Sequence, residues 1–191
     1  MEPSATAVLT IDMQNDVLES IVPTGREVVP AIQEALRAAR AAGIPVIHCV
    51  RHHRRDGCDV ERFRLQGFLD RPFLVPGTAG AELIRELAAR TDEIQVPKAR
   101  FSAFFQTDLL LVLMRLGVRN LVLVGVQTPN CVRCTATDAL SYDFDVVLLE
   151  DAIAAATPQV HEANLFDMAN MGMSIMPVAR FVQEIGTPTA A

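Results

Sequence analysis

Short apolar runs alternate with segments of helical periodicity along the whole chain. Apolar runs that favour strands cover residues 7–11, 44–50, 93–96, 120–124, 145–149 and 173–176. Apolar residues recur at helical spacing over residues 27–42, 79–89, 107–116, 131–141, 158–170 and 179–185. Strands that alternate with helices in this way are typical of a mostly parallel sheet with helices on both faces. We therefore predict a three-layer α/β/α sandwich with a six-stranded, Rossmann-like sheet.

The composition indicates one globular domain. The chain has 191 residues, of which 50% are hydrophobic and 21% charged, and this balance excludes a disordered chain. We expect a single domain over residues 1–191, with short tails at residues 1–5 and 186–191. Residues 51–78 have the least regular pattern, and we expect them to form an excursion beside the functional site.

Charge and hydropathy limit the classes of partner. The chain carries 17 basic and 23 acidic residues, a formal net charge of −6, which disfavours a nucleic-acid partner. Its apolar runs are far shorter than the roughly 18 residues of a membrane span. No basic residue precedes Arg26, whereas a signal peptide has a charged start. We expect a cytoplasmic protein whose partner is a small-molecule substrate, with no nucleic acid and no membrane.

The cysteine and histidine patterns do not predict a metal site. The four cysteines are Cys49, Cys58, Cys131 and Cys134, and without an export signal we expect them to be reduced. The pair Cys131-x-x-Cys134 lacks the second close pair of a zinc ribbon. His52 and His53 are adjacent, and neighbouring side chains on an extended segment point apart. We therefore interpret this region as a solvated basic loop, and predict no metal and no cofactor.

Three chemically active side chains follow the ends of different predicted strands. Asp12 follows the first strand, Lys98 follows the third, and Cys131 opens the helix after the fourth. The carboxyl ends of parallel strands lie at one edge of the sheet, and open α/β sheets bind ligands at that edge. With Thr128 as N-cap and Pro129 as first helical residue, Cys131 would lie in the first turn, where the helix dipole and Lys98 would lower the pKa of its thiol. Asp12 could accept the thiol proton.

Each of these residues also has an ordinary structural interpretation. Free cysteines are usually buried small hydrophobes. Asp12 could cap a helix, and Lys98 could form a surface ion pair. Spacing alone does not show that the three side chains meet.

Three segments resemble the isochorismatase-like cysteine hydrolase superfamily, in the order that this superfamily uses. They are TIDMQND at residues 10–16, KARFSAFFQTDL at residues 98–109 and GVQTPNCVRCTATDAL at residues 125–140. The resemblance implies the isochorismatase-like hydrolase fold and a catalytic triad of Asp12, Lys98 and Cys131. It also implies a cis peptide between Val126 and Gln127, with the N–H groups of Gln127 and Cys131 facing an oxyanion.

The resemblance further implies hydrolysis of a C–N bond. Isochorismatases cleave a vinyl ether and commonly lack the nucleophilic cysteine, so Cys131 favours a small amide, carbamoyl or ureide substrate and a thioester intermediate. Many nicotinamidases carry an Asp-x-His…His metal site after the second strand, and this pattern is absent here. Isochorismatase-type and nicotinamidase-type hydrolysis remain alternatives. Members of the superfamily are commonly dimers or tetramers, so we expect a homodimer or homotetramer.

The sequence gives weaker signals for residues that contact the substrate than for the catalytic triad. Arg54, in the basic cluster at residues 51–55, could clamp a carboxylate or a polar carbonyl. Phe104 could form a wall of the pocket, and Gln127 could hydrogen-bond a urea-like group. Gln14 completes this set. The competing interpretations are a solvated face for the arginine and core packing for the phenylalanine.

Three functions outside the superfamily stay open at this point. A phosphoryl-transfer or receiver-like module would use Asp12, Lys98 and the acidic pair Glu150 and Asp151, but Gln14 stands where such phosphatases usually need a second aspartate. A thiol oxidoreductase would use the Cys131-x-x-Cys134 pair, although this pair follows the fourth strand rather than an early one. The third is a catalytically silent binding protein on the same scaffold.

Overall fold

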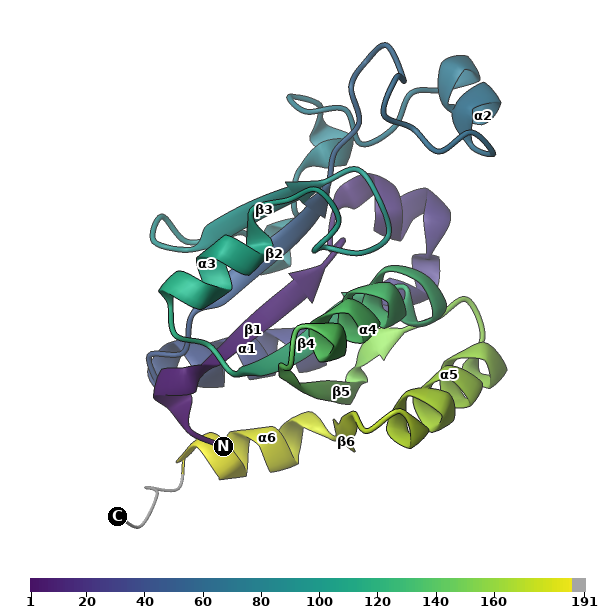
Figure 1. Cartoon of the computed structure of the whole chain (residues 1–191). Coiled ribbons are helices and arrows are strands. Elements are labelled where there is room, and N and C mark those ends of the chain that lie inside the picture. The colour runs from purple at the N-terminus through teal and green to yellow at the C-terminus, as the bar shows by residue number, and fades with distance from the viewer. Residues whose placement is uncertain (187–191) are drawn as a thin grey trace.

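Six parallel strands form one sheet in the computed structural model, which describes residues 1–186 (Figure 1). The strands are β1 Thr6–Ile11, β2 Val46–Arg51, β3 Ile94–Lys98, β4 Asn120–Val126, β5 Asp145–Ala154 and β6 Ser174–Met176. Their order across the sheet is β3-β2-β1-β4-β5-β6, and every neighbouring pair is parallel. The predicted six-stranded parallel sheet is confirmed.

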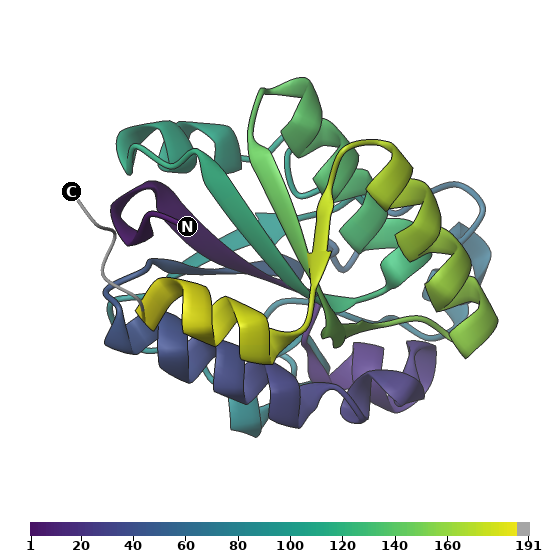
Figure 2. The same ribbon diagram turned by 90° about the horizontal axis from the view of Figure 1, so that it is seen from below.

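Helices cover both faces of the sheet, which gives the predicted three layers. The helices α1 Val29–Ala41 and α6 Val178–Gly186 lie on one face (Figure 2). The other face is covered by α3 Leu109–Arg115, α4 Arg133–Ser141 and α5 Pro158–Asn170. None of the helices within residues 1–186 is long and apolar enough to cross a membrane.

The central strand β1 explains why the apolar runs are continuous rather than alternating. All six of its residues are buried. Successive side chains of a strand point to opposite faces, so Val8 packs in the core under α1 and α6 whereas Leu9 packs in the core under α3, α4 and α5. A strand covered on both faces needs apolar residues at every position.

The two predicted tails lie at the edges of the described region. Pro3–Ala5 forms a 3-10 turn and Ala5 is buried, so the N-terminal segment packs onto the domain. Gly186 ends α6, and residues 187–191 of the predicted C-terminal tail lie outside the described residues.

The helix predicted over residues 79–89 is wrong. This segment forms two single 3-10 turns, Ala79–Ala81 and Arg85–Leu87. Between them the backbone is extended and pairs with the chain after β1, where Ile84 N–H donates to Met13 O at 3.0 Å and Asn15 N–H donates to Glu82 O at 3.0 Å. These backbone hydrogen bonds to a distant segment replace the local helical ones, so tertiary pairing overrides the helical periodicity.

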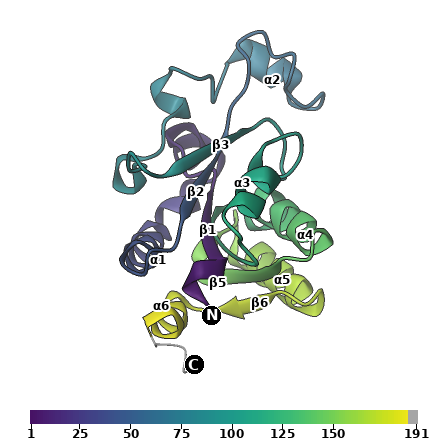
Figure 3. The ribbon, with the colours of Figure 1, turned by 60° about the vertical axis from the view of Figure 1, so that its left-hand side comes forward.

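Residues 52–78 form the expected excursion beyond the carboxyl end of β2. The excursion contains the short helix α2 Leu65–Asp70 and projects at the end of the sheet that lies away from the N-terminus (Figure 3). A small apolar cluster of Val60, Phe68 and Val75 gives it a core of its own. The excursion therefore stands over the edge of the sheet where parallel α/β proteins bind ligands.

Replacing Gly125 with alanine is expected to prevent stable folding. Gly125 has φ +112, and a Cβ there would lie 2.3 Å from Ile11 O and 2.8 Å from Ile11 N, both backbone atoms of the neighbouring strand. Because backbone atoms of a central strand cannot move aside, we expect a loss of at least about 3 kcal/mol in the free energy of unfolding. Urea denaturation of the purified variant measures it.

Gly43→Ala is the matched control for this substitution. Gly43 also has positive φ, +70, but apart from Gly43 and its two chain neighbours no atom of residues 1–186 would lie within 4 Å of a Cβ added there. It should lose only about 1–2 kcal/mol, the cost of the left-handed conformation itself. Equal losses for the two variants would show that conformation, rather than contact with β1, makes Gly125 necessary.

Candidate active site

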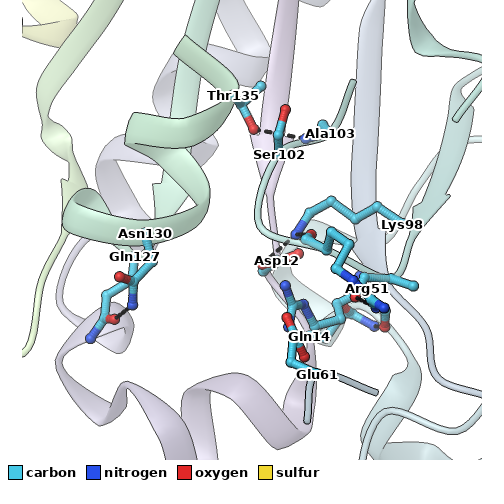
Figure 4. Close-up of polar contacts among 12 residues, drawn as sticks. Asp12, Gln14, Arg51, Glu61, Lys98, Ser102, Ala103, Gln127, Asn130 and Thr135 are labelled. Carbon is cyan, nitrogen blue, oxygen red and sulfur yellow. Dashed lines mark hydrogen bonds and ion pairs between the residues drawn. The ribbon is translucent and has the colours of Figure 1, made fainter. Parts of the chain in front are cut away.

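Asp12 and Lys98 form a buried ion pair at the carboxyl edge of the sheet. Lys98 is the last residue of β3 and Asp12 follows β1, and Lys98 Nζ lies 2.9 Å from Asp12 Oδ2 (Figure 4). The two residues are only 2% and 4% exposed. Lys98 Nζ also donates to Arg100 O at 3.2 Å, whereas Asp12 Oδ1 has no hydrogen-bond partner among the described residues. One carboxylate oxygen is thus held by the lysine and the other remains able to accept a proton.

The backbone at Asp12 ends the strand and turns the chain. Asp12 has φ +53, a left-handed conformation that aspartate tolerates better than most residues. Its N–H donates to Cys49 O at 2.9 Å, which is the last bond of the β1–β2 ladder. The carboxylate is therefore fixed at the edge of the sheet by the strand that carries it.

Cys131 lies in a π-helical turn between β4 and α4. The turn covers Thr128–Val132, follows β4 by one residue, and leads directly into α4. The peptide bond between Val126 and Gln127 is cis. Cys131 is 7% exposed and lines the same cavity as Asp12. The structure thus brings together the three residues Asp12, Lys98 and Cys131.

Thr128 differs from its predicted role as a helix cap. The residue before this turn makes no capping hydrogen bond with its side chain, and Thr128 itself is the first residue of the turn. The hydroxyl of Thr128 instead lies 3.0 Å from Nδ1 of His161 on α5. This contact ties the turn that carries Cys131 to the neighbouring helix.

The predicted lowering of the Cys131 pKa is wrong. Burial, followed by the Asp12 carboxylate, raises the pKa of this thiol to about 12, although the positive charges of Lys98 and Arg51 act in the opposite direction. Loss of hydration and the adjacent negative charge outweigh the cations. The thiol is therefore protonated at neutral pH, and it needs a base within reach to become a nucleophile.

Arg51 lies in the site, although the sequence analysis chose Arg54 from the same basic cluster as the candidate contact. It ends β2, is 2% exposed, and lines the cavity that contains Cys131 and Asp12. Its Nη1 donates to Glu61 Oε1 at 2.9 Å, and its guanidinium lies 5.1 Å from the centre of the Phe101 ring. The strand-end rule that selected Asp12 and Lys98 also points to Arg51, and applying it to β2 would have identified this residue.

Arg54, the arginine predicted to contact substrate, lies outside the site. Its side chain is 70% exposed and pairs with Asp56 at 3.7 Å. Its backbone N–H donates to the Asp59 carboxylate. The physical reason is that β2 ends at Arg51, so that Arg54 already belongs to the turn by which the excursion leaves the sheet.

Gln14 and Phe104 are structural rather than substrate contacts. Gln14 is fully buried, and its amide group is used by three hydrogen bonds, two with the backbone of Arg51 and one with Ala81 O. It therefore fixes the end of β2 to the 79–89 segment. Phe104 is buried in the core, 5.4 Å from the Tyr142 ring, and does not line the cavity.

Gln127 lies at the site as predicted, but its side chain has a local partner. The residue lines the cavity beside Cys131. Its Oε1 accepts a hydrogen bond from Asn130 Nδ2 (Figure 4). The side chain thus steadies the turn that carries Cys131.

The cavity beside Cys131 is small. Its volume is about 30 Å³, room for roughly two water molecules at about 10–15 Å³ each. Ile21 and Arg64 line both this cavity and a larger outer cavity of about 330 Å³. Phe101 lines both the cavity beside Cys131 and a third cavity of about 510 Å³. A substrate larger than water therefore requires these walls to move.

His53 is not part of a solvated loop, contrary to the prediction. It is fully buried in the excursion, with its ring edge-on to Phe68 at 5.8 Å and to Phe73 at 5.6 Å. His52 is half-buried. Within residues 1–186 no group of three or more His, Cys, Asp or Glu side chains is placed to hold a metal ion.

Burial of His53 predicts that acid destabilises the fold. Burial, and then the charge of Arg51, lower the pKa of His53 from 6.5 to about 4. Because the folded-state pKa is below the unfolded one, this contribution to stability is complete above pH 6.5 and is lost as the pH falls through 4. We expect His53 to account for roughly 3 kcal/mol of the loss over this window.

Urea denaturation at pH 7 and pH 4 tests this expectation. His53→Phe should lose less stability than the wild type between these two pH values, because the neutral ring does not take up a proton. An equal loss in both proteins would show that other groups cause the acid sensitivity.

Comparisons with known proteins extend over nearly the whole chain. The family model described as the isochorismatase domain matches residues 6–180. An Arabidopsis thaliana protein called a probable inactive nicotinamidase is 43% identical over 188 residues, which cover 94% of this chain and 96% of that protein. The ureidoacrylate amidohydrolase RutB of Rhizobium rhizogenes is 32% identical over 196 residues, covering 88% of this chain and 78% of that protein. The crystal structure of an isochorismatase family protein from Desulfovibrio vulgaris has a TM-score of 0.91 and 40% identity, covering 96% of this chain and 99% of that one.

Proposed function

The chain belongs to the isochorismatase domain family, and on this basis we propose that it is a cysteine hydrolase that cleaves a C–N bond of a small amide, carbamoyl or ureide substrate. One observation carries the proposal: Cys131 and Asp12 line the same small cavity, and Lys98 Nζ lies 2.9 Å from the Asp12 carboxylate. A nucleophile, a base beside it and a cation that orients the base form the arrangement that covalent catalysis requires.

The first half of the reaction forms a thioester. Cys131 Sγ attacks the substrate carbonyl carbon while Asp12 accepts the thiol proton, and the C=O bond opens to a tetrahedral oxyanion. The pKa of about 12 for the thiol means that proton transfer accompanies the attack rather than precedes it. The C–N bond then breaks, Asp12 gives its proton to the departing nitrogen, and ammonia or an amine leaves.

The second half restores the enzyme. Water attacks the thioester carbonyl while Asp12 again accepts a proton, and collapse of this second tetrahedral intermediate breaks the C–S bond and returns the proton to Cys131. Lys98 keeps Asp12 oriented through both halves. We assign the backbone N–H groups of Gln127 and Cys131, two residues that line the cavity, to the oxyanion.

The position of Cys134 favours a hydrolase over a thiol oxidoreductase. Cys134 lines the third cavity, together with Phe105 and Arg133, and not the catalytic cavity that contains Cys131. Both cysteines are free thiols. The name of the RutB relative, an amidohydrolase, supports C–N cleavage as the chemistry.

A catalytically silent binding protein is the second candidate. The name of the Arabidopsis relative, a probable inactive nicotinamidase, and the small volume of the cavity, about 30 Å³, both favour it. We rank it second because the three catalytic side chains of this chain are present and meet. We also keep the expectation of a homodimer or homotetramer, for which exposed Leu111 and Met114 on α3 would offer an apolar surface, and which light scattering would test.

Ammonia release from a panel of substrates tests the proposal. The panel contains small primary amides, N-carbamoyl amino acids and ureides, each assayed with the wild type and with Cys131→Ala. We expect at least one compound to release ammonia with the wild type and none with the variant. Release that continues in the variant would contradict cysteine catalysis, and no release from any compound would favour the silent binding protein.

A further inference from the structure

Two arginine side chains line the catalytic cavity, and one of them, Arg51, has buried donors with no acceptor among the described residues. We propose that Arg51 and Arg64 form a binding subsite for a carboxylate, so that the substrate is an acid that also carries the amide, carbamoyl or ureide group. This inference rests on the proposed hydrolase function and names its substrate class.

The free donors of Arg51 are the first observation. Its Nη1 is bound to Glu61, but its Nε and Nη2 are buried and have no hydrogen-bond partner among the described residues. A buried donor without an acceptor costs free energy, so such an atom at a cavity wall points to a ligand that supplies the acceptor. Nε and Nη2 share one edge of the guanidinium, and this edge binds a carboxylate through two parallel N–H···O bonds.

Arg64 supplies the second observation. It precedes α2 in the excursion, and its guanidinium lies 5.2 Å from the centre of the Phe101 ring and 5.1 Å from that of Phe63. The side chain makes no ion pair with any carboxylate among residues 1–186. Phe101 therefore contacts two guanidinium groups, because Arg51 lies 5.1 Å from the same ring.

Among the charged side chains around the cavity, one positive side chain has no counter-charge of its own. Asp12 is balanced by Lys98, and Arg51 is balanced by Glu61. Arg64 makes no ion pair of its own among the described residues, although its charge also acts on Glu61, and it lines both the catalytic cavity and the outer cavity. A substrate with a single negative charge completes this balance, whereas a neutral amide supplies neither the charge nor the second oxygen of a bidentate pair.

The test compares N-carbamoylglycine with its methyl ester, which has nearly the same shape but no charge. The kcat/KM of the wild type should be about 100-fold higher for the acid than for the ester, because only the acid makes a charge-assisted bidentate contact. Arg64→Gln should reduce this preference about 10-fold, mostly by raising the KM of the acid. Arg51→Lys keeps a positive charge opposite Glu61 but loses the bidentate edge, and it should also reduce the preference for the acid. Arg54→Gln, which removes an exposed arginine of the same excursion, is the matched control and should leave the preference unchanged.

A purely catalytic or structural role for the arginines gives a different result. If Arg51 acted only on the thiol or on the oxyanion, its variant would slow both compounds by the same factor, and the preference for the acid would stay at its wild-type value. That outcome would overturn the subsite.

Calorimetry with Cys131→Ala separates failure of the subsite from failure of the hydrolase. In this background the acid should bind at least about 10-fold more tightly than the ester, and adding Arg64→Gln should remove most of the difference. Equal binding of the two compounds, or no binding of either, would overturn the carboxylate subsite. Selective binding of the acid, together with a wild type that releases no ammonia, would confirm the subsite and overturn the hydrolase function alone.

Discussion

Cys131→Ala is expected to abolish hydrolysis, lowering kcat by at least about 10⁴-fold, while the protein keeps its fold. The alanine has no group that can form the thioester, and the remaining side chains of the cavity do not replace it. Because Cys131 sits in a turn held by Thr128 and by the start of α4, the loss of one sulfur atom should not disturb the backbone. Ammonia release measures activity, and circular dichroism with thermal unfolding measures the fold.

Cys134→Ser is the matched control for this prediction. It changes a thiol only three residues away, which is half-buried and lines a different cavity. Hydrolysis should stay within a few-fold of the wild type. Equal loss of activity in both cysteine variants would indicate that the two thiols act as a pair, and activity of Cys131→Ala above about 1% would show that the cysteine is not the nucleophile.

Asp12→Asn is expected to lower kcat by about 10³-fold or more, since the amide cannot take the proton of a thiol whose pKa is about 12. Asparagine also accepts the left-handed backbone at this position, where φ is +53. The substitution has a second consequence, because it leaves Lys98 buried without a counter-charge. Breaking a buried pair in this way typically costs about 3–5 kcal/mol of stability. Steady-state kinetics and urea denaturation of the same preparation measure the two effects.

The double variant Asp12→Asn/Lys98→Met separates catalysis from stability. It removes both charges, and replacing a whole buried ion pair with groups of similar volume is often neutral for stability. We expect stability to return toward the wild-type value and activity to stay absent. Recovery of activity together with stability would contradict the role of Asp12 as the base.

The sheet and the three catalytic candidates could be predicted because each has a local signal. Strands such as β1 are buried on both faces and appear as continuous apolar runs. Residues that follow strand ends, such as Asp12 and Lys98, meet at one edge because parallel strands share one direction. The same rule selects Arg51 over Arg54, because Arg51 directly follows the apolar run at residues 44–50 and ends β2 in the structure.

The features that were predicted incorrectly depend on contacts between distant segments. Residues 79–89 have helical periodicity, but Ile84 and Glu82 pair with the backbone after β1, which no local pattern reveals. The pKa of Cys131 depends on how completely the excursion and the turn bury it, and burial outweighs the helix terminus and the cations. The buried position of His53 likewise depends on Phe68 and Phe73, which lie fifteen and twenty residues further along the excursion.

Hydroxylamine trapping tests the covalent intermediate on Cys131 most directly. Hydroxylamine competes with water for a thioester, so the wild type, given the best substrate of the panel, should form a hydroxamate or an N-hydroxyurea in an amount that rises with hydroxylamine concentration while ammonia or amine release continues. Release that continues with no trapped product at saturating hydroxylamine would show that water attacks the substrate directly, and would contradict nucleophilic catalysis by Cys131.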